Sequence, residues 1–393
     1  MLEVHLQLEG DYSIGILESR PGGETPCPHD PPSLTLPKVQ EPMAKEPMAK
    51  LILHFDVNET IIVEDAAGGD TRAACLNKIM CKSILVDTTD DPVRRYADGV
   101  PLIGSDPVAS TSHPPFCFEF EKPANTETYY RGGKALKQTV ASFHEHAHGN
   151  RFTNIRESLQ EALAAPGDYP AALLSKSSST PSHFIIPSFF HTLYTLLHVQ
   201  KRDVGIILRT YGDDVDEIVA AIELFASGGH PMYPDANLPG LMRIRKCVGR
   251  YSGDGEFVVR EASGGERVGN SETELLEAIE SEPCVAIQDD YEFWSEGGCS
   301  PACGKPVWVT EEGDGPAHIF FDDNIHNSPE DSIVAVRARK GEGEGFEAVS
   351  GAETLAYEGR NIVKCFTVPA VLEKDYFLKE IERCERNQSK HLL

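Results

Sequence analysis

The sequence predicts an α/β fold: a doubly wound, mainly parallel, Rossmann-like sheet with a large cap-like region inserted into it. Three apolar runs end in polar residues, at Leu51–Asp56, Asp203–Thr210 and His318–Asp323. Short apolar runs bounded by turns are typical of strands that are buried on both faces of a parallel sheet. Ligands bind such sheets at the carboxyl ends of the strands, so the residues that end these runs are candidate site residues.

Residues 1–48 are expected to lie outside the folded core. The segment from Pro21 to Pro47 is rich in proline, glycine and polar residues, and a tandem repeat follows in which Glu41–Lys45 recurs as Glu46–Lys50. Such a composition is typical of segments that bury too little apolar surface to fold. Residues 1–48 are therefore predicted to be a disordered or low-complexity N-terminal segment.

The rest of the chain divides into a core and an insertion. Alternating strand and helix patterns predict an α/β core made of residues 49–84 and 186–393. Residues 85–185 mix Pro/Ser-rich loops with short apolar pieces and two helix candidates, near Lys134–His146 and at Ile155–Leu163. So irregular a stretch between regular elements indicates an insertion that lies over the core.

Capping signals and apolar stripes predict the core helices. Asp70 or Thr71 is placed to cap a helix with an inner stripe at Leu76, Ile79 and Met80. Asp213 is the expected N-cap of a helix that ends at Gly228. The other expected elements are helices at Phe189–Leu197, after the capping box Ser271–Glu274, and at Ala370–Cys384, strands at Cys284–Gln288 and Ser332–Arg337, and a hairpin of Leu241–Ile244 with Phe257–Val259.

Composition argues against a nucleic-acid-binding, membrane-spanning or disulfide-rich protein. The chain has 36 Lys and Arg against 62 Asp and Glu, a net charge of −26, which opposes binding to nucleic acid or to an anionic membrane. No apolar run reaches the ~18–20 residues that cross a bilayer, and the start lacks the pattern of a signal peptide. Ten thinly spread cysteines favour free thiols. We therefore expect a cytoplasmic protein.

The residues at the strand ends share a suitability for phosphoryl chemistry. In chain order they are Asp56, Asn58, Thr60, Thr210, Lys305, Asp322 and Asp323. A carboxylate such as Asp56 can attack phosphorus, and paired acids such as Asp322 and Asp323 can help it to hold Mg²⁺. Thr210 can donate a hydrogen bond to a phosphate oxygen, and Lys305 can neutralise the charge that develops during transfer.

This order of residues resembles the haloacid dehalogenase (HAD) superfamily, whose members are mostly Mg²⁺-dependent phosphatases and phosphotransferases. The family's first motif is an apolar strand ending in Asp-x-Asp-x-Thr/Val, which Asp56–Thr60 matches except at one position. Its second is an apolar strand ending in Thr or Ser, matched by Ile206–Thr210, and its third is a lysine, for which Lys305 is the best candidate. Its fourth is an apolar strand ending in paired acids, matched by Ile319–Asp323.

The resemblance implies a hydrolase that acts on a small phosphorylated substrate through an aspartyl-phosphate on Asp56. It implies that Mg²⁺ is bound by Asp56, Asp322 and Asp323, with Asn58 contributing through its backbone carbonyl. The insertion at residues 85–185 stands where the family often places a cap that closes over the substrate and selects it.

Two positions depart from the family pattern. Asn58 replaces the aspartate that protonates the leaving oxygen and later activates water, so this step should lose a factor of about 10²–10⁴. The alternative function is therefore a catalytically weakened phosphate-binding or regulatory protein. Lys305 lies close to Asp322 in sequence, with no room for a helix between them, and Lys246 and Arg209 are less favoured substitutes.

Two further groups of residues could also form part of a functional site. Asp289-Asp290 also follows an apolar run and is either a rival fourth motif or the cap of a helix through Trp294. His144, His146 and His148 could bind a metal ion, although a polar helix end is the favoured interpretation. Outside the family resemblance, the remaining hypothesis is a generic α/β protein whose strand-end acids do not converge.

Overall fold

The computed structural model describes residues 50–65, 69–87, 117–118, 124–130, 140–145, 149–311, 315–325, 332–339, 341 and 345–391. All of them belong to one compact unit, Met48–Leu393, which is separate from Met1–Pro47. The predicted N-terminal segment lies outside the described residues. So does most of the helix candidate at Lys134–His146.

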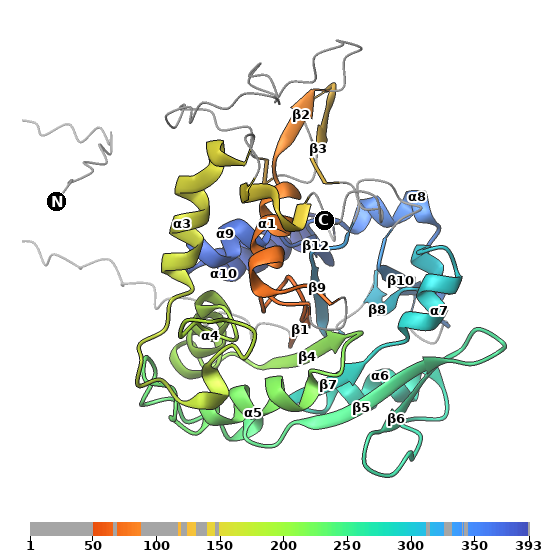
Figure 1. The fold of residues 1–393 in the computed structure, drawn as a ribbon. Helices are drawn as coiled ribbons and strands as arrows, with labels where there is room; N and C mark the ends of the chain where they lie inside the picture. Colours follow the sequence, from red (N-terminus) through yellow and green to blue (C-terminus); the bar gives the residue numbers. More distant parts are fainter. Residues whose placement is uncertain are drawn as a thin grey trace, which may run out of the picture. The chain divides into compact units, whose positions relative to one another are not determined.

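In the described part of the chain, seven strands form a central sheet whose neighbours are all parallel except the last pair (Figure 1). The coarse prediction of an α/β fold with a mainly parallel sheet is confirmed. In sheet order the strands are β12 (Ile362–Lys364), β9 (Ala317–Asp322), β1 (Leu51–Asp56), β4 (Val204–Thr210), β7 (Cys284–Gln288), β5 (Arg245–Tyr251) and β6 (Phe257–Glu261).

The strand register brings the three apolar runs to one edge of the sheet. β1 lies between β4 and β9, with Asp56 opposite Arg209 and Phe55 opposite Phe321. The residues that follow Phe55 and Phe321, and Thr210 at the end of β4, therefore meet at the carboxyl edge. This is the edge at which the sequence predicts a site.

The central sheet is buried on both faces. Leu53 and Phe55 of β1 pack into a core cluster with helices, whereas Ile52 packs into a second cluster on the other face. The helices of the first cluster are α1 (Arg72–Cys81), α3 (Thr153–Ala162), α4 (Pro187–Leu193), α5 (Val215–Ala226), α9 (Thr367–Leu372) and α10 (Tyr376–His391). Burial on both sides explains why β1 is apolar without alternation.

The second face carries helix α6 (Glu272–Glu280), which packs on Ile52. It also carries a small sheet in which β10 (Val334–Arg339) lies between β11 (Glu347–Ala348) and β8 (Lys305–Thr310). Val307 of β8 and Phe320 of β9 share a third apolar cluster, which holds the small sheet against the large one. The remaining elements are the hairpin β2 (Leu85–Asp87) and β3 (Thr126–Thr128), and helices α7 (Tyr291–Glu296) and α8 (Gly351–Thr354).

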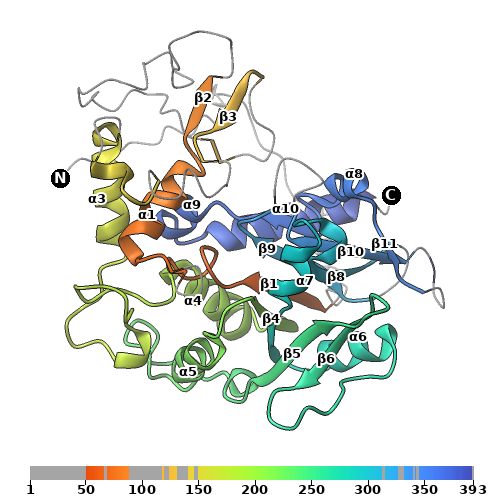
Figure 2. The same ribbon diagram turned by 45° about the vertical axis from the view of Figure 1, so that its right-hand side comes forward.

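The described residues of the predicted insertion contribute to the same core as the sheet. Leu159 of α3, Phe184 and Ile185 belong to the first core cluster, and Ile62 forms a bridge with Ile185. The β2–β3 hairpin lies beyond α1 and away from the central sheet in both views (Figures 1 and 2). Among the described helices, none combines the length and apolarity needed to cross a membrane.

Two predicted helix caps are confirmed, whereas a strand boundary and a third helix cap are wrong. Thr71 and Ser271 cap α1 and α6 through their hydroxyl groups. The first strand of the predicted hairpin begins at Arg245, after a 3₁₀ turn at Pro239–Leu241, and not at Leu241. The N-cap of α5 is Asp214 and not Asp213, and its side chain makes no capping hydrogen bond. The carboxylate is instead bound by two other side chains, which are described below.

The predicted helix at Ala370–Cys384 is two helices. The backbone is extended at Glu373, between α9 and α10. Val368 and Val371 belong to α9, which is buried on nearly all sides, whereas the amphipathic stripe begins only at Tyr376. The sequence pattern joined two apolar stretches that pack in different ways.

A buried histidine gives the fold a pH dependence. The ring of His230 is enclosed by aromatic rings, with Phe190 at a centroid distance of 4.7 Å and Tyr233 at 5.2 Å. Burial, and then the nearby His183, lower the pKa of His230 to about 4 from 6.5. The folded-state pKa of His230 lies below its unfolded value, so the unfolded chain takes up a proton first as the pH falls. The contribution of the neutral, buried ring to stability is therefore complete above pH 6.5 and is lost as the pH falls towards 4.

We therefore expect the free energy of unfolding to fall by up to about 3 kcal/mol between pH 7 and pH 4 through His230 alone. Urea denaturation across this range measures the change. The His230→Gln variant should show a shallower fall than the wild type. Equal slopes in the two proteins would contradict the assignment to His230.

Candidate functional site

Lys305 links the ends of two central strands. Its Nζ forms ion pairs with Asp56, at the end of β1, and with Asp322 Oδ2, at the end of β9, the latter at 3.0 Å. All three side chains are buried. The short sequence separation from Asp322 is explained because Lys305 begins β8, which packs beside β9 and needs no intervening helix.

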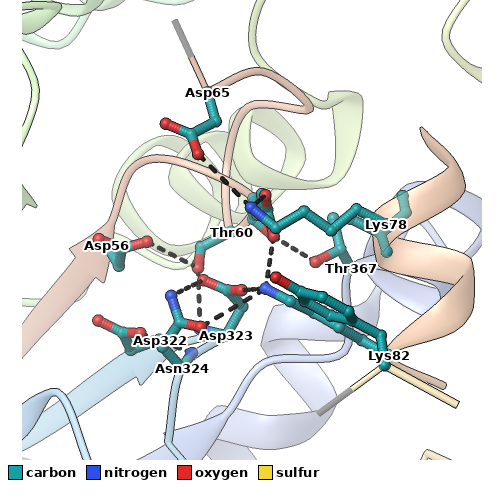
Figure 3. Close-up of polar contacts among 12 residues, drawn as sticks. Asp56, Thr60, Asp65, Lys78, Lys82, Asp322, Asp323, Asn324 and Thr367 are labelled. Carbon is teal, nitrogen blue, oxygen red and sulfur yellow. Dashed lines mark hydrogen bonds and ion pairs between the residues drawn. The ribbon is translucent and has the colours of Figure 1, made fainter. Parts of the chain in front are cut away.

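Asp323 and Thr60 complete this cluster. Thr60 Oγ1 donates a hydrogen bond to Asp56 Oδ2 at 3.1 Å and accepts one from the backbone N–H of Asp323 at 3.1 Å (Figure 3). Carboxylate oxygens of Asp56, Asp322 and Asp323 all lie within 4.8 Å of one another. Mg²⁺ prefers oxygen ligands, so the donor set of these three residues fits this ion.

The carboxylates carry more negative charge than the neighbouring lysines offset. Burial and the repulsion of Asp322 raise the pKa of Asp56 well above its usual range, against the opposing effect of Lys305. Burial likewise raises the pKa of Asp323 to about 6, although the nearby Lys82 opposes this. Raised pKa values in adjacent acids indicate a place where additional positive charge would be stabilising.

Lys78 of α1 and Lys82, the C-cap of the same helix, contact this cluster, and the sequence analysis singled out neither. Lys82 binds Asp323 and lies 2.5 Å from Glu59 Oε2, while Lys78 binds Glu59 and lies 3.5 Å from Asp65 Oδ2. Burial alone would raise the pKa of Glu59, but the two lysines lower it to about 2. Figure 3 shows the two side chains side by side, as expected of positions four residues apart on a helix.

These contacts tie the loop after β1 to the end of β9. Glu59 has a left-handed backbone conformation, with φ at 61°, and its carbonyl accepts a hydrogen bond from Thr367. Lys82 then joins Glu59 to Asp323 across the two strand ends. The spacing of Lys78 and Lys82 was the only sequence signal, and it does not say which loop α1 faces.

Asn58 and Thr210 form a second group at the same edge. Thr210 Oγ1 lies 3.1 Å from Asn58 Oδ1 and 2.9 Å from Asp214 Oδ1. Asn58 Nδ2 donates a hydrogen bond to Asp214 Oδ2 at 2.8 Å. The predicted residues Asn58 and Thr210 thus meet at this edge, and Asp214, which the sequence analysis did not single out, lies between them.

The competing residues have other partners. Arg209 forms a two-pronged ion pair with Asp289, with Nε to Oδ2 at 2.9 Å, and neither side chain is exposed. Asp290 accepts a hydrogen bond from the backbone N–H of Phe293 and so caps α7, as one of the two interpretations predicted. Lys246 is partly exposed and binds Asp216. None of these four side chains has a recorded contact with Asp56, Asp322 or Asp323 in the described residues.

The histidine cluster and one cavity formed by described residues lie elsewhere. His144 is within 2.8 Å of Asn77 Nδ2, while His146 and His148 lie outside the described residues. A cavity of about 610 Å³ is lined by Leu51 and Ala317, where β1 and β9 begin. It therefore opens at the amino edge of the sheet, opposite the candidate site.

Comparison of the chain with protein-family models, with curated proteins and with solved structures finds no match in any of the three. The assignment of a function therefore rests on the geometry of Asp56, Lys305, Asp322 and the residues around them.

Proposed function

We propose that the protein is a Mg²⁺-dependent hydrolase of the HAD type, which cleaves a phosphate monoester through an aspartyl-phosphate on Asp56. The observation that carries this proposal is the contact of Lys305 with both Asp56 and Asp322. Lys305 is 249 positions from Asp56 and 17 from Asp322 in the sequence, and its contact with both supports the proposal. The doubly wound arrangement of the core and the cap-like role of residues 85–185 are part of the proposal.

The first chemical step is attack of an Asp56 carboxylate oxygen on phosphorus. A bond forms between this oxygen and phosphorus, and the bond from phosphorus to the leaving oxygen breaks. Thr60 and Lys305 orient Asp56, and the Lys305 ammonium offsets negative charge that develops during transfer. Mg²⁺ bound by Asp56, Asp322 and Asp323 would supply further neutralisation of phosphate charge.

A second candidate is a phosphate-binding or regulatory protein with weak turnover. The observation that favours it is the amide of Asn58, whose Nδ2 donates a hydrogen bond to Asp214 and whose Oδ1 lies 3.1 Å from Thr210 Oγ1. An amide cannot donate a proton and later accept it back, so Asn58 cannot itself serve as acid and base. The two candidates share the same site and differ in turnover.

The test is hydrolysis of a panel of small phosphomonoesters by the wild type and by Asp56→Asn, with Mg²⁺ or with a chelator. We expect Mg²⁺-dependent release of phosphate by the wild type and none by Asp56→Asn, because an amide lacks the nucleophilic oxygen anion. Asp216→Asn, which changes an exposed carboxylate of α5, is the matched control and should retain the wild-type rate.

Mg²⁺ binding measured by calorimetry separates the two candidates. Binding without hydrolysis would favour the phosphate-binding alternative. Hydrolysis that persists in Asp56→Asn, or that does not depend on the metal ion, would contradict the proposed mechanism.

A further inference from the structure

The carboxylate of Asp214 is held by two residues of the candidate site. Its Oδ2 accepts a hydrogen bond from Asn58 Nδ2 at 2.8 Å, and its Oδ1 accepts one from Thr210 Oγ1 at 2.9 Å. Asp214 follows Thr210 by four residues, in the turn between β4 and α5. It therefore belongs to the carboxyl edge at which Asp56 also ends its strand.

Asp214 does not serve as a helix cap. It occupies the N-cap position of α5, but its side chain makes no capping hydrogen bond to that helix. The turn also makes room for it: a Cβ built on Gly212 would lie 3.1 Å from Asp214 Oδ2, tighter than ordinary side-chain packing. Gly212 thus permits a close approach that other residues would oppose.

Asp214 retains the capacity to bind a water molecule. A carboxylate offers about four acceptor positions, and Asn58 and Thr210 use two of them. The side chain is half-buried, so that solvent can reach it. Asp214 thus lies, with free acceptor positions, directly beside Asn58, whose amide cannot take up a proton in this way.

We propose that Asp214 is the general base that Asn58 cannot be, an inference that rests on the proposed function. In the second step, the oxygen of a water molecule forms a bond to the phosphorus of the aspartyl-phosphate. One proton of this water passes to the Asp214 carboxylate, and the bond between phosphorus and the Asp56 oxygen breaks. Inorganic phosphate leaves, the Asp56 carboxylate is restored, and Asp214 returns its proton to solvent. Asn58 is then a positioning residue, which holds Asp214 by its amide.

The test uses Asp214→Asn in the full chain with Mg²⁺ and p-nitrophenyl phosphate, whose leaving group departs without a proton from the protein. We expect a burst of about one equivalent of nitrophenolate per chain, followed by turnover reduced by about 10²–10⁴-fold. The aspartyl-phosphate should accumulate, which intact mass measured after an acid quench detects as added phosphate. Asp213→Asn is the matched control, because the Asp213 carboxylate accepts a hydrogen bond from Gln288 and should not affect either phase.

A double variant distinguishes chemistry from folding. Asn58→Asp combined with Asp214→Asn moves the carboxylate across one hydrogen bond and should restore part of the turnover. Unchanged turnover in Asp214→Asn, or equal loss of the burst and of turnover with no rescue in the double variant, would overturn the role of Asp214. If the wild type shows neither metal-dependent hydrolysis nor phosphate on Asp56, the proposed function is wrong and this inference fails with it.

Discussion

Replacement of Lys305 by methionine is expected to lower the free energy of unfolding by about 3–5 kcal/mol, measured without metal at neutral pH. The Lys305 ammonium lies between two buried carboxylates, Asp56 and Asp322, and is itself fully buried. Burial alone would lower the pKa of Lys305, but the neighbouring acids raise it above its usual value, so that the ammonium is charged in the folded state. Methionine keeps most of the volume and removes the charge, which leaves the acids without their shared partner.

The same change should abolish formation of the aspartyl-phosphate. The pKa of Asp56 is already raised by burial and by Asp322, and it will rise further without the opposing effect of Lys305. Asp56 would also lose the partner that orients it and that offsets charge during transfer. Urea denaturation in a chelator measures the stability, and acid-quenched mass measures the phosphorylation.

Lys246→Met is the control for this experiment. Lys246 also pairs with an aspartate, but both side chains are exposed, so its removal should leave the free energy of unfolding nearly unchanged. Similar losses in the two variants would contradict the view that Lys305 is a buried counter-ion of the site.

The central fold could be predicted because its strands are buried on both faces. Leu51–Asp56 and Ala317–Asp322 read as apolar runs that stop at acids, and both are strands of the central sheet. Helix caps such as Thr71 and Ser271 could be predicted for a related reason, since a cap depends on residues three positions away. Each of these signals lies in neighbouring residues, and neighbouring residues are enough to form a buried strand or a helix cap.

The failures concern residues whose partners are distant in the chain. Asp213 and Asp214 are equally good caps in sequence, and the choice between them depends on Asn58, 156 residues away from Asp214. In the same way, nothing near Lys82 in sequence indicates that it binds Asp323. The proximity of the residues that end β1, β4 and β9 could be predicted because parallel strands bring their carboxyl ends together. Lys305, which was also expected at the end of a strand, instead begins β8 of the small sheet, and its approach to Asp56 has no such local signal.

Arg209 is another residue whose partners are distant in the sequence. Its removal should lower the free energy of unfolding as much as the removal of Lys305. Its guanidinium is completely buried, binds both oxygens of Asp289, the residue after β7, and donates from Nη1 to the backbone carbonyl of Pro306 at 2.8 Å. Since Pro306 follows Lys305 on β8, this one side chain joins two central strands to the strand that carries the site lysine.

We expect Arg209→Met to lose about 3–5 kcal/mol of unfolding free energy in urea denaturation, because Asp289 is then a buried charge without a partner. Arg209→Met combined with Asp289→Leu should recover much of this loss, since two well-packed apolar side chains often replace a buried ion pair without cost. A double variant as unstable as the single one would assign the loss to the bond with Pro306. Arg209 would then act by fixing β8, and with it Lys305, against the central sheet.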